Sequence, residues 1–241
     1  MFLDLEKCEN MEIIKKNEEE ILHYIMTFMG GFMGLYALCA FENYGSAQTG
    51  NLMNLVINLV DGNIRGTLIR VGAFVLFCTG IAVSWLLYRF FTLPMREISL
   101  LLDAVGLAIS AFMPDNVDHY LRLYPLFVVT SFQWGTFNRV GKNASASLFI
   151  TGNLKNCVHH WLRFLVDHER EALTGARIYT ITILGFLAGG YAGCVVILHI
   201  GFMGVFYGYI PLAAAEIIIL TGKETKLKTG IAGSEKIQDN Y

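Results

Sequence analysis

Charge is scarce in this chain. Asp, Glu, Lys and Arg together make up 16% of its 241 residues, and hydrophobic residues make up 54%. A soluble domain usually carries about 25% charged residues. The missing charge is concentrated in long apolar stretches, of which 21–41, 71–88 and 178–215 are the clearest. This distribution argues against a soluble enzyme or a nucleic-acid-binding protein, and it predicts an integral membrane protein.

The sequence also lacks the short motifs of catalytic and cofactor sites. It contains no P-loop, nucleotide-binding fingerprint, zincin helix or nucleophile elbow. Five cysteines occur without CxxC spacing, and we interpret them as small buried apolar residues rather than as redox or metal ligands. His159 and His160 are adjacent, so they do not form a helical metal-binding pair. We therefore expect no cofactor, no metal site and no enzymatic activity.

The apolar stretches predict six membrane spans. A helix needs about 20 apolar residues to cross about 30 Å of hydrocarbon. The stretch 178–215 is nearly twice that long, so we expect it to fold back near His199 and Gly201. The acidic first twenty residues do not resemble a signal peptide and predict a cytosolic tail at 1–20. The membrane domain is expected at 21–221 and a second cytosolic tail at 222–241. The predicted spans are 21–42, 67–90, 97–114, 121–139, 177–198 and 200–221.

The basic residues indicate how these spans are oriented. Six spans place both termini on the same side of the membrane. If that side is cytoplasmic, every Lys and Arg lies inside except Arg65, Arg70 and Arg122. The positive-inside rule favours this orientation. The sequence therefore predicts a multi-pass protein of the cytoplasmic membrane with both termini in the cytoplasm.

A short motif occurs twice. Thr49-Gly50-Asn51-Leu52 recurs as Thr151-Gly152-Asn153-Leu154, each time between the first and second of three spans. The chain thus divides into repeat one, 21–114, and repeat two, 121–221. Three spans per repeat force the second copy to enter the membrane inverted, as in many transporters and channels. The predicted fold is all-α, with two inverted three-helix repeats that each carry a short TGN-initiated half-helix. A duplicated scaffold without transport is the alternative.

The two TGN segments are the predicted substrate-binding regions. Thr and Asn favour helix N-termini as caps, and polar residues then recur on one helical face. A half-helix with its N-terminus at mid-membrane offers free N–H groups to a polar or anionic solute. The alternative is a cap on an interfacial amphipathic helix whose asparagines face water. The predicted binding residues are Gln48, Thr49, Gly50, Asn51, Asn54, Thr151, Gly152, Asn153 and Asn156.

Two acidic residues lie inside predicted spans. A carboxylate at the centre of a span costs at least about 2.5 kcal/mol on insertion scales. Asp103 and Glu216 are therefore candidates for proton or cation coupling. The alternative is that each is a hydrated acid near the interface.

The segments Ser46-Ala47-Gln48-Thr49-Gly50-Asn51 and Thr151-Gly152-Asn153-Leu154, with their Gly-rich flanking spans, resemble the YoaK-like family of uncharacterised bacterial multipass membrane proteins. The resemblance covers roughly 21–221. It implies a six-span inner-membrane protein and carries no established activity.

These observations predict a small secondary transporter or channel for a small polar or anionic solute. A non-transporting membrane scaffold is the alternative from a different class, followed by an intramembrane enzyme acting on a lipid head group. The expected partners are membrane lipid and a small solute, with homo-oligomers as a further option and no nucleic acid.

Overall fold

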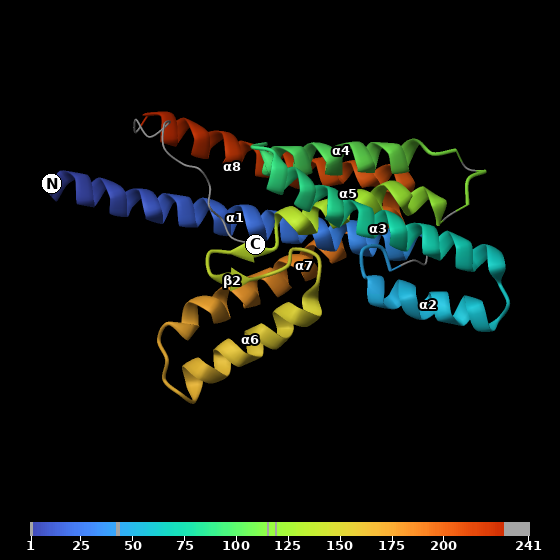
Figure 1. Ribbon diagram of the computed structural model, residues 1–241, viewed down its shortest axis with the longest axis horizontal. Coiled ribbons are helices and arrows are strands. Elements are labelled where there is room, and N and C mark those ends of the chain that lie inside the picture. Colours follow the sequence, from blue (N-terminus) through green and yellow to red (C-terminus); the bar gives the residue numbers. More distant parts are fainter. Residues whose placement is uncertain (1, 42–43, 115, 119, 229–241) are drawn as a thin grey trace.

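The computed structural model describes residues 2–41, 44–114, 116–118 and 120–228. These residues are mainly helical, and the first helix is a single rod that continues through most of the predicted N-terminal tail (Figure 1). The predicted C-terminal tail lies largely outside the described residues. The elements in chain order are α1 (Phe2–Phe41), α2 (Gln48–Val60), α3 (Ile64–Phe90), α4 (Met95–Phe112), η1 (Leu121–Leu123), α5 (Tyr124–Thr136), β1 (Arg139–Val140), β2 (Asn143–Ala144), α6 (Ile150–Leu165), α7 (Ala172–Ile200), η2 (Phe202–Gly208) and α8 (Tyr209–Lys228).

The helices pack in matching pairs. Helix α1 packs on α7, and α5 packs on α3. Helix α6 lies along α7, and α2 lies along α3 (Figure 1). Helix α8 packs on α1, and α4 packs on α5. If α1, α2, α3 and α4 are matched with α5, α6, α7 and α8, each contact in one half therefore has a counterpart in the other.

Glycines allow the close approach in both of the main seams. A Cβ at Gly189 or Gly193 of α7 would meet the backbone of Phe28 or Phe32 of α1. In the seam between α3 and α5, a Cβ at Gly80 would meet Ser131 Oγ and the backbone carbonyl oxygen of Val128, and a Cβ at Gly135 would meet Ser84 Oγ. Small residues allow the backbones of membrane helices to approach closely, and the α1–α7 seam is the tighter of the two because more of its glycines, Gly31 included, face backbone atoms.

Four helical segments are long and apolar enough to cross a membrane: Asn17–Ala40, Ile64–Phe90, Ala172–Ile200 and Phe202–Glu224. They make the chain a multi-pass membrane protein. The chain reverses between the last two at Gly201, whose φ of 77° suits glycine. Helix α4 has 18 residues and α5 has 13, which correspond to about 27 Å and about 20 Å of helix. The structure thus supports several spans, and six remains a prediction.

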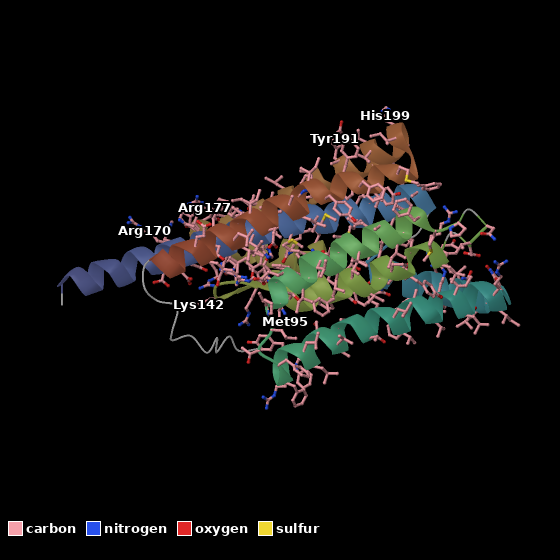
Figure 2. The ribbon with its side chains drawn as sticks, turned by 90° about the horizontal axis from the view of Figure 1, so that it is seen from above. Met95, Lys142, Arg170, Arg177, Tyr191 and His199 are labelled. Carbon is pink, nitrogen blue, oxygen red and sulfur yellow. The ribbon has the colours of Figure 1, made fainter. Side chains whose placement is uncertain are left out.

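Ion pairs mark the two ends of the molecule. At one end Arg96 lies 3.7 Å from Glu18 and 3.6 Å from Glu19, and Lys223 pairs with Glu97. Met95, Lys142, Arg170 and Arg177 gather toward this end, whereas Tyr191 and His199 lie toward the other (Figure 2). At that second end Arg65 pairs with Asp118 at 2.9 Å. We call these the Arg96 end and the Arg65 end.

The cysteines only partly follow their predicted burial. Cys157 is buried and Cys194 is half-buried, but Cys39 and Cys78 are exposed on the outside of the helices. Burial was inferred from the apolar character of the spans, and an apolar side chain on a membrane helix can equally face lipid. All four thiols are free.

Candidate functional site

The two TGN segments begin helices that start away from the ends of the molecule. Helices α2 and α6 run in opposite directions along its long axis, and α6 starts nearer the middle than α2 (Figure 1). Helix α2 leads to α3 at the Arg65 end, and α6 leads to α7 at the Arg96 end. The outer surface of α2 is apolar, with Leu52, Met53 and Val56 among its exposed side chains.

Neither helix begins in the way that the capping prediction required. The helices start at Gln48 and Ile150, with Ala47 and Phe149 at the N-cap positions and no side-chain cap. Thr49 and Thr151 are therefore the second helical residues, and both are exposed. The predicted capping role is wrong because the loops already place a residue with a non-helical backbone ahead of each helix.

The asparagine of each motif is buried and bonded to the preceding loop. Asn51 Nδ2 donates to the carbonyl oxygen of Gly45 at 2.9 Å. Asn153 Nδ2 donates to the carbonyl oxygen of Ala146 at 2.7 Å, and its Oδ1 accepts the amide N–H of the same residue at 3.2 Å. Both asparagines occupy the fourth helical position. The shared function of the motif, as seen in the bonds, is to fix a loop against the first helical turn.

The glycines of the two motifs have different surroundings. A Cβ at Gly50 would lie 2.6 Å from the ring of Tyr44, so this position accommodates the tyrosine. No atom lies within 4 Å of the corresponding point at Gly152. Only the first motif therefore needs glycine for packing.

The polar residues further along both helices face the protein. Asn54 is half-buried, and the amide of Asn58 covers Gly66 of α3. In α6, Asn156 Nδ2 donates to Tyr179 Oη at 3.3 Å, and this hydroxyl donates to the carbonyl oxygen of Ala144 at 2.9 Å. Each polar stripe thus lines the contact with the next helix.

A buried polar cluster lies behind the start of α6. His23 Nε2 lies 3.0 Å from Ser145 Oγ, which is 3.3 Å from Thr182 Oγ1. Gln133 Nε2 donates to the carbonyl oxygen of Met26 at 3.0 Å and to Ser147 Oγ at 3.3 Å. All of these side chains are at most 2% exposed. The cluster joins α1, α5, α7 and the loop before α6 by interhelical hydrogen bonds.

Four members of this cluster, His23, Ser145, Ser147 and Thr182, were not predicted from the sequence. The two serines lie in a loop whose fold depends on distant contacts, so local sequence carries no signal for them. His23 stands alone among apolar neighbours at the start of the first span, and this isolation was the only available signal.

The corresponding region before α2 contains space instead of a bonded cluster. Ser46 is buried and lines a small cavity with Met33, Thr130 and five mainly apolar neighbours. The space that a water-sized sphere can reach is about 10 Å³, close to the volume for one water molecule. Both amide atoms of Gln48 and the Oδ1 atom of Asn51 are buried without a hydrogen-bond partner in the described part of the chain. These atoms remain available to a polar ligand.

The comparison with known proteins decides the family. The family model described as "protein of unknown function (DUF1275)" matches residues 22–220. The chain belongs to this family. The match spans both TGN helices and confirms the resemblance expected from the motifs. No curated protein and no solved structure matches the chain.

The two acidic candidates of this DUF1275 chain differ in burial. Asp103 on α4 is 0% exposed, and neither of its carboxylate oxygens has a hydrogen-bond partner among the residues described. Ser99, one turn away on the same face, is also fully buried, and its hydroxyl is likewise unpartnered there. Glu216 on α8 is only half-buried. Of the two predicted coupling candidates, only Asp103 is buried.

Metal ligands do not gather in the described ranges of this DUF1275 chain. Within them, no three His, Cys, Asp or Glu side chains lie close enough together to hold a metal ion. The larger hollow is an outward-facing groove of about 760 Å³ lined mainly by apolar side chains of α3 and α5, including Trp85 and Trp134. Its lining suits lipid contact better than a path for a polar solute.

Proposed function

We propose that this DUF1275 protein is a small secondary transporter or channel for a small polar or anionic solute, with α2 and α6 as paired half-helices. The carrying observation is that both helices start away from the ends of the molecule and run in opposite directions along its long axis (Figure 1). Broken helices that start at mid-membrane form the solute sites of many transporters. Their first N–H groups and positive dipole ends favour polar or negative groups.

The matched packing of the two halves supports an inverted repeat. The α1–α7, α6–α7 and α1–α8 contacts have counterparts in α5–α3, α2–α3 and α5–α4. An inverted repeat provides two related conformations, because either half can adopt the packing of the other. On this proposal, six helices span the membrane, α4 and α5 among them, and both termini lie in the cytoplasm.

Differences in polar bonding support a division of roles between the halves. The region before α6 is closed by the cluster of His23, Ser145 and Thr182. Before α2, the loop residues Gly45 and Ser46 line a small cavity, and both amide atoms of Gln48 are buried without a partner among the described residues. In the α6 cluster, His23 Nδ1 and Gln133 Oε1 are the atoms without such a partner. We assign solute binding in this conformation to the α2 side and closure to the α6 side.

Asp103 is the proposed coupling residue. A carboxyl group that lies deep within the helix bundle without a basic partner can carry a proton across a transport cycle. Replacement with Asn keeps its size and removes the proton exchange. We expect Asp103→Asn to abolish solute currents driven by a pH gradient, while binding of the solute persists.

The experiment that tests transport uses purified protein in proteoliposomes. Stopped-flow light scattering reports the entry of glycerol, urea, formate and acetate, and currents on a solid-supported membrane report charged solutes. We expect at least one solute to enter faster with the protein than without it, and Asn51→Ala to reduce that rate at least tenfold. Leu52→Ala, on the exposed face of the same helix turn, serves as the matched control.

The scaffold alternative gives the opposite result. If none of these solutes enters faster than in protein-free vesicles, transport is rejected and a structural membrane role is favoured. If transport occurs but Asn51→Ala and Asn153→Ala both leave it unchanged, the TGN helices are removed from the mechanism.

A further inference from the structure

Arg70 is a buried cation at the Arg65 end of the molecule. It lies on α3 and is 9% exposed. Its Nε and Nη1 atoms have no hydrogen-bond partner in the described ranges. Its Cζ atom lies 4.9 Å from the centre of the Tyr120 ring, which holds the guanidinium group but accepts no conventional hydrogen bond. Arginine does not lose its proton in proteins, so a full charge remains there.

The neighbouring acid is already engaged. Asp118 Oδ2 accepts a hydrogen bond from Arg65 Nη2 at 2.9 Å, and its Oδ1 accepts the amide N–H of Tyr120 at 3.0 Å. Arg65 itself is exposed, with 79% of its side chain accessible. The exposed Arg65 therefore forms the ion pair with Asp118, whereas the buried Arg70 retains N–H donors without an acceptor in the described ranges. A buried charge of this kind is stabilised by an opposite charge.

Helix geometry brings Arg70 to the polar stripe of α2. A Cβ at Gly66 would lie 2.8 Å from Asn58 Nδ2, which fixes the level of the antiparallel α2–α3 pair. Arg70 is four residues after Gly66, and Asn54 is four residues before Asn58. Because α2 and α3 are antiparallel, Arg70 and Asn54 each lie one helical turn from the Gly66–Asn58 contact in the same direction, and therefore at the same height along the helix pair. One further turn of α2 reaches Asn51, beside the unpartnered Gln48 amide.

We infer that Arg70 binds a small oxyanion, and that the polar stripe of α2, which packs on α3, extends from this site toward Asn51. The binding site stands on the buried guanidinium, whereas its place on a transport path rests on the proposed function. Guanidinium N–H groups match carboxylate and phosphate oxygens, and the side-chain amide of Asn58, whose Nδ2 faces α3, offers further donors. The ligand class is thus a small carboxylate or inorganic phosphate.

The test is thermal unfolding of the purified full chain in a neutral detergent. Sodium formate, acetate and phosphate are compared with sodium chloride at equal ionic strength, which controls for screening. We expect at least one oxyanion to raise the unfolding midpoint by about 2 °C or more in the wild type. Arg89→Gln, an exposed arginine on the same helix and away from Asp118, should keep this rise, and Arg70→Gln should lose it.

Other outcomes overturn the inference. A rise that persists in Arg70→Gln, a rise with chloride alone, or no rise in the wild type each reject the site. If Arg70→Gln does not yield folded protein, Arg70→Lys replaces it, because it keeps the charge and loses the planar donor group. A tenfold or greater weakening of the oxyanion effect is then expected, and an unchanged concentration dependence rejects the site.

The result is separable from that of the transport assay. Oxyanion stabilisation without flux leaves the Arg70 site in place and rejects transport. Flux of a neutral solute without oxyanion stabilisation leaves transport in place and rejects the Arg70 site.

Discussion

The two TGN helices begin with the same backbone arrangement, in which an asparagine binds the preceding loop, and they differ in the side chains around it. In α6, both amide atoms of Asn153 are bonded to Ala146, and a hydrogen-bonded cluster fills the space behind the loop. In α2, Asn51 makes one bond to Gly45, and its Oδ1 atom is buried without a partner in the described part of the chain. The motif itself therefore fixes a loop, and the two copies differ in how completely the asparagine amide is bonded.

The outer faces of the two helices differ as well. The exposed side chains of α2 include Leu52, Val56 and Leu59, all of which suit lipid. The exposed face of α6 alternates Leu154 and Val158 with Lys155, His159 and Arg163. The two helices thus resemble each other more in their inner contacts than in their exposed faces.

The largest expected effect on stability is a difference between the α1–α7 seam, which lies beside α6, and the α3–α5 seam, which lies beside α2. Gly189→Ala places a methyl group against the backbone carbonyl of Phe28, which cannot move away independently of α1. Gly135→Ala places it against the hydroxyl group of Ser84, which can rotate. We expect a loss of about 3 kcal/mol or more for Gly189→Ala, and of about 1 kcal/mol for Gly135→Ala. Unfolding in detergent and denaturant measures both.

A double variant controls the seam comparison. Ser84→Ala should remove most of the cost of Gly135→Ala because it deletes the obstructing oxygen atom. Equal losses for the two glycine variants would contradict the conclusion that the α1–α7 seam is the tighter one.

The next effect separates the two asparagines. Asn153→Ala leaves both the N–H and the C=O of Ala146 without their partner, whereas Asn51→Ala frees a single carbonyl. An unsatisfied buried polar group costs about 1–3 kcal/mol, so Asn153→Ala should be the more destabilising by at least about 1 kcal/mol. The same unfolding measurement applies, with Leu52→Ala and Leu154→Ala as controls on the exposed faces. A larger loss for Asn51→Ala would reverse our assignment of closure to the α6 side.

The helical class, a helix at each TGN motif and the turn at Gly201 could be predicted from the sequence. Each depends on the residues of a single segment, namely its apolar length or its glycine. The helix starts were predicted within one residue but attributed to capping by Thr49 and Thr151, which the loop backbone makes unnecessary. The buried cluster could not be predicted, since Ser145 contacts His23 across most of the chain. Arg70 could be counted among the basic residues, but its burial involves Tyr120, which lies in the connection between the two repeats.

The smallest effect is a difference of sign between the two motif glycines. Gly152 is in the first turn of α6 with open space beside it, so alanine there should stabilise the protein by about 0.5–1 kcal/mol through its higher helix propensity. Gly50→Ala gains the same propensity but displaces the ring of Tyr44, and we expect a net loss. Thermal unfolding of the two variants gives the signs, and Tyr44→Ala in the Gly50→Ala background should restore the gain. Two changes of equal sign would mean that Tyr44 does not rest on Gly50, and the contrast between the two motifs would then be limited to their asparagines.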